Sequence, residues 1–255
     1  MTRIENIKEK IIAFILLLTF PMFAIQLLPG FTYQFSGSFI IATINASLIT
    51  ALLSIGGYIM LVRAKHEQIP ANIPKPVTFL IIAIVVFGMI FVDQIVFTWI
   101  ESHIVDPGMQ MRTEAIASID IDTDLIPYLL YSLIIAPLSE ELLFRVYLYR
   151  YMKEYFSWIF AMISTSLMFG LVHLTISHLI SATLFGIFLC LILEKTKCIW
   201  ITIVTHIFYN CMTLTTTGNE MNDIASNTLL SVFIVISVIF VLGWFIAKQD
   251  MQFKK

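Results

Sequence analysis

The sequence has little charge for its length. Only 13% of the 255 residues are charged, whereas 59% are hydrophobic and the mean hydropathy is +0.91. Soluble globular domains carry about 25% charged residues, because their surfaces face water. The scarcity of charge therefore excludes a soluble domain and indicates an integral membrane protein.

Other missing features narrow the function further. The chain has no Gly-rich phosphate loop, no tandem repeat, no low-complexity tract and no basic patch for nucleic acid, so a nucleic-acid partner is not expected. Its three cysteines, Cys190, Cys198 and Cys211, all lie in or beside apolar runs. An odd number in such surroundings predicts small buried hydrophobic residues, not a disulfide framework.

Long hydrophobic runs are what the sequence does have. Runs of about 17 to 25 apolar residues suit membrane-spanning helices. They predict an all-α, polytopic transmembrane bundle of about eight spans, at residues 11–28, 39–62, 77–100, 125–148, 156–176, 178–193, 199–217 and 229–247. The sixth run is short, which leaves seven spans and a re-entrant segment as an alternative.

Basic residues alternate between the links. All Lys and Arg residues except Arg112 lie in alternate links: before span one, between spans two and three, between spans four and five, between spans six and seven, and after span eight. This count assigns Arg145, at the end of the fourth span, to the link that follows it. By the positive-inside rule, both termini face the cytoplasm. The remaining links are the uncharged 30–38 and the acidic 101–124, for which a solvated outer loop is favoured over a cation site.

Three charges interrupt the fourth span, in the stretch APLSEELLFR. Glu141 and Arg145 stand four residues apart, so a helix would pair them, while Glu140 points about 100° away around the axis. Pro137 cannot donate a hydrogen bond to the carbonyl of Leu133, so the helix should kink or restart there and open space beside Glu140. An intramembrane acid of this kind is a functional-site candidate, because burying a carboxylate in hydrocarbon is costly.

Two of the five histidines lie inside apolar spans and are candidate partners. They are His173, four residues after Phe169, and His206, four residues before Asn210. A buried histidine taken singly favours a hydrogen-bonded structural role, but these two converge with Glu140. His66 and His103 fall in predicted loops, and His178 is expected at a span edge in an interfacial role.

In this order the residues carry a family resemblance. Glu140, Glu141 and Arg145 match E-E-x-x-x-R, and F-x-x-x-H and H-x-x-x-N follow at 169–173 and 206–210. The ordered trio resembles the CAAX protease and bacteriocin-processing (Abi) family of glutamic intramembrane proteases. The resemblance covers 125–217 and divides the single membrane domain into an N-terminal three-span region (1–124), a core (125–217) and a last span with a basic cytoplasmic tail (218–255).

The resemblance also implies a catalytic role for each matched residue. Glu140 and His173 would activate water, while His206 and Asn210 would donate hydrogen bonds to the oxyanion. Glu141 and Arg145 would support the site, with Glu141 as a second candidate participant. No cofactor or metal is expected: two histidines and a glutamate can hold catalytic zinc, but the H-E-x-x-H motif is absent.

The expected function is an intramembrane endopeptidase in a bacterial cell membrane. Its substrate would be a membrane-associated peptide, such as a pheromone or bacteriocin precursor or a lipidated C-terminal tail, reached from a cavity in the cytoplasmic half of the bilayer. The alternative is a non-proteolytic scaffold that regulates a membrane partner, a sensor kinase or a cell-wall enzyme. A transporter would also use buried charges, but no inverted repeat supports one.

One smaller pattern predicts structure only. Ala182, Gly186 and Cys190 recur every four residues along the sixth span. Small residues at this spacing let two helix backbones approach closely in a membrane. The pattern therefore predicts a helix-packing face.

Overall fold

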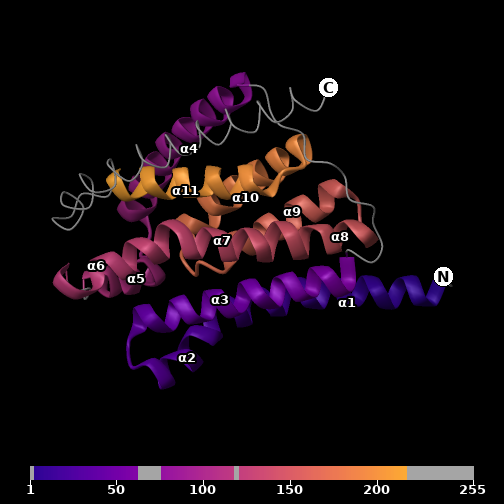
Figure 1. The fold of residues 1–255 in the computed structure, drawn as a ribbon. Coiled ribbons are helices and arrows are strands. Elements are labelled where there is room, and N and C mark those ends of the chain that lie inside the picture. Colours follow the sequence, from indigo (N-terminus) through magenta and orange to yellow (C-terminus); the bar gives the residue numbers. More distant parts are fainter. Residues whose placement is uncertain (1–2, 63–75, 118–120, 217–255) are drawn as a thin grey trace, which may run out of the picture. The chain divides into compact units, whose positions relative to one another are not determined.

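The computed structural model describes residues 3–62, 76–117 and 121–216. All regular elements in these three ranges are helical, which confirms the all-α prediction (Figure 1). In chain order they are α1 Arg3–Met22, η1 Phe23–Leu27, α2 Leu28–Ser36, α3 Phe39–Gly57, η2 Tyr58–Val62, α4 Pro76–His103, α5 Pro107–Ala117, α6 Ile121–Leu130, η4 Tyr131–Ile135, α7 Ala136–Glu141, η5 Leu142–Tyr149, α8 Arg150–Tyr155, α9 Trp158–Leu171, α10 Ile176–Thr196 and α11 Ile199–Thr216, where η marks π-helical segments.

The chain divides into two compact units. The first unit is Met1–Ile207, and the second is Phe208–Lys255, so that the boundary falls inside α11. All the contacts described below lie within the first unit unless the second is named.

Four helices of the described ranges are long and apolar enough to cross a membrane. They are Ile7–Ser36, Phe39–Leu61, Thr78–His103 and Ile176–Thr196. Two shorter apolar helices, Trp158–Leu171 and Ile199–Leu214, match the predicted fifth and seventh spans. The predicted fourth span lies in the helical run from α6 to α8, and the predicted eighth span falls outside the described residues. The predicted short sixth span is a full-length helix, α10.

Both links predicted as loops contain a helix. In 30–38 the chain stays helical to Ser36 and turns only at Gly37, whose φ of 65° suits a residue without Cβ. In 101–124, α5 begins at Pro107, and the carboxylate of Asp106 accepts a hydrogen bond from the Met109 amide at 3.2 Å. Proline at a helix start and an aspartate cap are both favourable, so local signals formed helices where polarity alone predicted loops.

Side-chain caps fix where the apolar helices begin. Ser38 accepts from the Ile41 amide at 3.5 Å before α3, and Ser157 accepts from the Phe160 amide at 3.3 Å before α9. Thr175 accepts from the His178 amide at 3.1 Å before α10. Each cap satisfies an amide that would otherwise lack a partner at a helix start.

Among the described helices, α9 and α10 form the most extensive pair. At Gly186 an added Cβ would meet Ser166 Cβ at 3.0 Å, so the two backbones approach closely there. This confirms the packing face predicted from Ala182, Gly186 and Cys190. In the rest of the unit, α3 packs against α7 and η5, α1 packs against α8, and α4 packs against α10.

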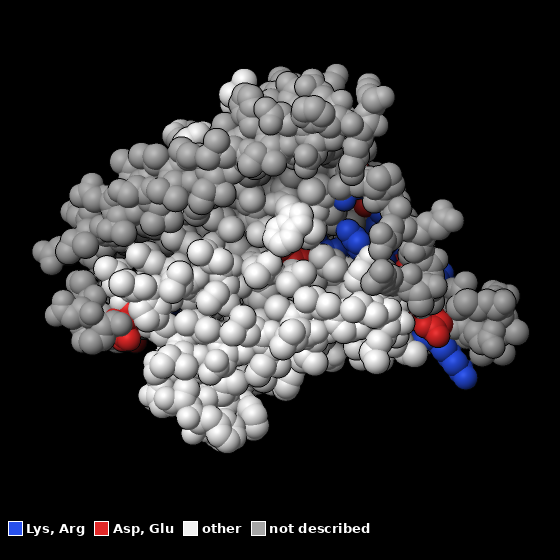
Figure 2. Space-filling model, viewed as in Figure 1, with Lys and Arg blue, Asp and Glu red and all other residues white. Residues whose placement is uncertain are grey.

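Large apolar side chains on the outer helices are exposed. Leu52 on α3 is 69% exposed, and Ile84 and Phe91 on α4 are 61% and 69% exposed. Figure 2 shows a broad stretch of the described surface without a charged side chain. A surface of this kind suits contact with lipid and not with water.

The basic links meet at one end of the helices. The Tyr155 hydroxyl donates to Glu9 at 2.9 Å, and Arg150 donates to the Tyr58 hydroxyl at 3.1 Å. At the same end Lys153 hydrogen-bonds to Glu194, which also accepts from the Tyr149 hydroxyl at 2.9 Å. These described segments lie together as charge alternation predicted; the basic residues in 63–75 and 248–255 lie outside the described residues, and the cytoplasmic placement of this end stays a prediction.

Candidate active site

Two π-helical segments flank the glutamates. The segment η4 ends at Ile135, α7 carries Pro137 in its first turn, and η5 begins directly after Glu141. A π turn widens the helix and commonly lies at functional sites. The helix thus changes its winding where Pro137 cannot donate, as expected, and presents both glutamates from one short α-helical turn.

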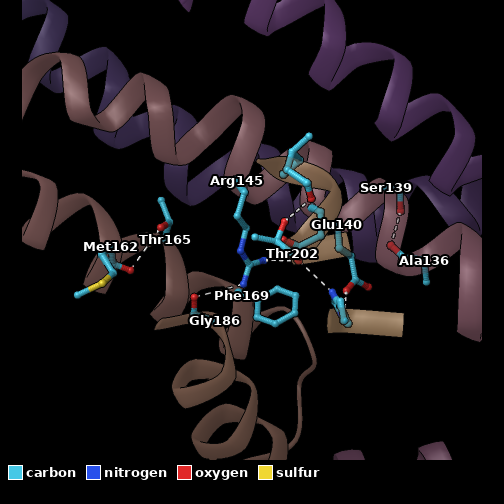
Figure 3. Close-up of polar contacts among 12 residues, drawn as sticks. Ala136, Ser139, Glu140, Arg145, Met162, Thr165, Phe169, Gly186 and Thr202 are labelled. Carbon is cyan, nitrogen blue, oxygen red and sulfur yellow. Dashed lines mark hydrogen bonds and ion pairs between the residues drawn. The ribbon is translucent and has the colours of Figure 1, made fainter. Parts of the chain in front are cut away.

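Glu141 and Arg145 form a buried ion pair. Arg145 Nη1 lies 3.1 Å from Glu141 Oε1, and the two side chains are 1% and 0% exposed. Arg145 Nη2 also donates to the Gly186 carbonyl at 3.4 Å, and the guanidinium lies 4.6 Å from the ring centroid of Phe169 (Figure 3). The predicted pair is confirmed, and it also connects η5 to α9 and α10.

His206 contacts both glutamates. Its Nδ1 lies 2.9 Å from Glu141 Oε1, and its Nε2 lies 3.6 Å from Glu140 Oε2. The imidazole ring lies edge-on to the rings of Phe169 and Phe185, at interplanar angles of 90° and 80°, with centroids 5.8 and 5.2 Å away. Aromatic edges therefore hold the ring in one plane while its two nitrogens face two carboxyl groups.

The hydrogen bonds of this cluster restrict where its protons reside. A carboxylate only accepts, so the Nδ1 atom of His206 must carry a proton toward Glu141. Arg145 and Glu141 cancel each other in charge. Glu140 and His206 then form a neutral group when they hold one further proton between them, either as acid and imidazole or as carboxylate and imidazolium. Burial favours such neutrality, because an unbalanced charge in apolar surroundings is costly.

His173 lies just beyond the end of α9. Its Nδ1 is 2.7 Å from the Phe169 carbonyl oxygen. Because a carbonyl only accepts, Nδ1 is the protonated nitrogen, and the lone pair of neutral His173 resides on Nε2. Within the described residues no hydrogen bond joins His173 to Glu140. The Phe169 ring contacts both histidines, with centroids 5.2 Å from His173 and 5.8 Å from His206.

The candidate residues lie at different levels along the helices. The buried cluster lies at the level of Gly186, halfway along α10, and His173 lies at the turn between α9 and α10. That turn is at the opposite end of the helices from Lys153 and Glu194. The candidate residues thus extend from mid-helix toward the end away from the basic links, and the expected opening of a cavity toward the cytoplasmic half of the bilayer stays a prediction.

Asn210 lies one helical turn beyond His206 on α11 and belongs to the second unit. Its expected role beside the oxyanion stays a prediction.

Sequence reasoning missed two residues near His173. The His178 ring, predicted to be merely interfacial, stacks on His173 with centroids 5.7 Å apart and an interplanar angle of 2°. Gln26, in the first span, donates from its amide to the carbonyl of Val172. Gln26 could have been noticed as a polar side chain inside an apolar span. No feature of the sequence indicates that the turn after α9 brings His178 against His173.

Within the ranges that the structure describes, no group of three or more His, Cys, Asp and Glu side chains is arranged to hold a metal ion.

Comparison with known proteins agrees with the interpretation of the three sequence motifs. A family model described as "Type II CAAX prenyl endopeptidase Rce1-like" matches residues 122–212. Residues 122–212 are therefore similar to an Rce1-like domain. The resemblance to the CAAX protease and bacteriocin-processing family is thereby confirmed for this segment, and the Rce1-like domain contains all six candidate residues.

One curated relative matches a similar length of chain. The Bacillus subtilis (strain 168) protein YdiL, described as a candidate membrane peptidase, is 32% identical over 82 residues. The match covers 32% of this chain and 34% of YdiL, so the chain aligns with about a third of that relative. None of the solved structures compared with the chain matches it significantly.

Proposed function

We propose that this protein is an intramembrane endopeptidase in which Glu140 activates the attacking water. The observation that carries the proposal is the position of His206, with one nitrogen on Glu141 and the other facing Glu140. A buried imidazole between an ion-paired carboxylate and a second carboxyl group forms an acid-base pair, which peptide hydrolysis requires. The Rce1-like domain supports membrane peptidase chemistry at this position.

The reaction begins with a proton transfer from water. Glu140 takes the proton as the water oxygen attacks the scissile carbonyl carbon, and the carbonyl oxygen becomes an oxyanion. The Nε2 of His173 is a second acceptor, because its Nδ1 is bound to the Phe169 carbonyl. When the C–N bond breaks, Glu140 returns the proton to the departing amine, so that the enzyme ends as it began.

His206 is the proposed oxyanion donor. Its Nδ1–H stays on Glu141, and Nε2–H turns from Glu140 to the substrate oxygen as charge develops there. This requires the imidazolium form of His206, whose charge is balanced by the Glu140 carboxylate, since Glu141 is already paired with Arg145. The gap of 3.6 Å between Nε2 and Glu140 is longer than a hydrogen bond, as is common before substrate binds. Asn210 would supply a second donor.

Glu141 and Arg145 serve as support. Arg145 holds Glu141 in place, and Glu141 in turn fixes the tautomer and the plane of His206. A carboxylate that orients a histidine in this way acts on catalysis through the histidine, as in serine protease triads.

The proposed substrate is a peptide held at the membrane surface or within it. The buried position of the cluster between apolar helices favours a substrate that enters from lipid. Two probes separate the substrate classes: a fluorescence-quenched peptide ending in a prenylated CAAX-type sequence, and the same peptide without the prenyl group. Cleavage of the prenylated probe alone by protein in lipid vesicles supports a lipidated tail, and cleavage of both supports peptide precursors.

The alternative function is a scaffold without proteolysis. It predicts that a strain lacking the native copy is rescued equally by wild type and by Glu140→Gln at equal membrane abundance. Proteolysis predicts instead that a processed peptide, detected by mass spectrometry of membrane and secreted fractions, is lost in the variant. Rescue without any processed peptide would overturn the proposed function.

A further inference from the structure

The turn that carries His173 is conformationally strained. Leu174, the next residue, has a φ of 55°, in the left-handed region that a residue with Cβ seldom adopts. Such a conformation is unfavourable for a residue with Cβ and persists only where the surroundings hold it. The turn has short-range hydrogen bonds of its own, from the His173 and Leu174 amides at 3.2 and 3.1 Å, which do not by themselves explain the strain.

Asp106 holds this turn from outside. It precedes α5, is 8% exposed, and uses one carboxylate oxygen for each of two helix starts. Oδ1 accepts from the Met109 amide of α5 at 3.2 Å, and Oδ2 accepts from the Ile176 amide of α10 at 2.8 Å. One charged side chain thus joins α5 to α10, with favourable interactions at both N-termini.

Two neighbours add to this attachment. Gly108 packs so closely on the turn that an added Cβ at this position would overlap the Leu174 carbonyl oxygen. From the first span, Gln26 donates to the carbonyl of Val172, the residue before His173. Contacts from two parts of the N-terminal region therefore fix the backbone on both sides of His173.

The first turn of α10 connects the fixed backbone to the His173 ring. Thr175 hydrogen-bonds through its hydroxyl to the His178 amide at 3.1 Å and to His178 Nδ1 at 2.7 Å. The His178 ring then stacks in parallel on His173. The Ile176 amide that Asp106 binds therefore lies only two residues before His178, whose ring contacts His173.

We propose that Asp106 and Gln26 are positioning residues for His173, through the turn between α9 and α10. The N-terminal region, for which the sequence indicated no role, would thereby keep His173 Nε2 aimed at the reacting centre. The proposal rests on the proposed function for its kinetic consequences, but the placement of the His173 ring can be measured without any substrate.

The test combines kinetics with histidine NMR. The variants are Asp106→Ala, which removes both acceptors; Asp106→Asn, which keeps one acceptor oxygen; and Gly108→Ala, which disturbs the same contact without changing a charge. Glu114→Ala is the matched control, an exposed acid on α5. Rates are measured with the quenched probes in lipid vesicles. The ¹⁵N signals of labelled histidines, with His173 assigned from His173→Gln, report which ring nitrogen carries the proton.

We expect Asp106→Ala and Gly108→Ala to lower kcat by about 10²-fold with KM changed little, since a misplaced catalytic group costs about this much. Asp106→Asn should recover part of the rate, and Glu114→Ala should match wild type. In wild type, His173 should show one tautomer protonated at Nδ1, and in both damaging variants a mixture of tautomers.

The outcomes separate the two proposals. A fall in kcat with unchanged His173 signals overturns the positioning role, and so does a changed His173 tautomer with wild-type kcat. Unchanged rates and signals in Asp106→Ala overturn it as well. If wild-type protein cleaves neither probe but the His173 signals change as expected, the positioning role stands and the proposed function fails.

Discussion

Removing Arg145 should destabilise the protein much more than removing the whole ion pair. In Arg145→Met the Glu141 carboxylate loses its cation at 3.1 Å while remaining fully buried. The Gly186 carbonyl and the Phe169 ring lose their contacts with the guanidinium as well. Breaking a buried pair from one side costs about 3–5 kcal/mol.

The double variant Glu141→Gln/Arg145→Met tests the cause. Glutamine can still accept from His206 Nδ1 but leaves no buried charge, and replacement of a whole buried pair is often close to neutral. We therefore expect the double variant to recover at least half of the stability lost by Arg145→Met.

Thermal unfolding in mild detergent measures both effects. At about 2–4 °C per kcal/mol for a chain of this size, Arg145→Met should lower Tm by roughly 6–20 °C. The control is Arg112→Met, an exposed arginine, which should leave Tm unchanged. A wild-type Tm for Arg145→Met, or a double variant less stable than Arg145→Met alone, would refute the argument that Glu141 depends on Arg145 for charge balance.

Two further predictions concern packing and the basic end. Gly186→Val should lower the unfolding free energy by about 1–3 kcal/mol, because even a Cβ would meet Ser166 at 3.0 Å; an unchanged Tm would show that α9 and α10 are not in close contact. Glu194→Ala should cost less than about 1 kcal/mol, and less still in high salt, because Glu194 and its partners Lys153 and Lys197 are 25%, 32% and 30% exposed. A large, salt-independent loss in denaturant unfolding would contradict this account of the cluster.

Much of the site could be predicted because its signals are local. Charges are so rare in the apolar spans that Glu140, Glu141 and Arg145 stand out, and the spacing of four residues alone pairs Glu141 with Arg145. The same holds for the small residues of α10. In each case one helix repeat fixes which residues share a face, and hydrocarbon surroundings restrict what a polar residue there can do.

The rest depends on contacts between distant segments. Nothing in the sequence near Asp106 indicates that its carboxylate reaches Ile176, seventy residues further on. The sequence also did not indicate that one histidine, His206, would face both Glu140 and Glu141, because this contact joins helices far apart in the chain. The expected role of Glu140 beside His173 stays a prediction. The alternation of basic residues predicted which links lie at the same end of the helices. The position of His173 at the opposite end could not be predicted in this way, because it depends on α9 ending at Leu171.

The central claim is that Glu140 activates water for peptide hydrolysis. The most direct measurement is the initial rate of cleavage of the quenched probes by purified protein in lipid vesicles, for wild type, Glu140→Gln and the exposed control Glu114→Gln. Loss of a general base typically lowers the rate by about 10²–10⁴-fold. The account predicts a loss of this size in Glu140→Gln, with unchanged Tm and a wild-type rate in Glu114→Gln. Equal rates in wild type and Glu140→Gln would contradict it.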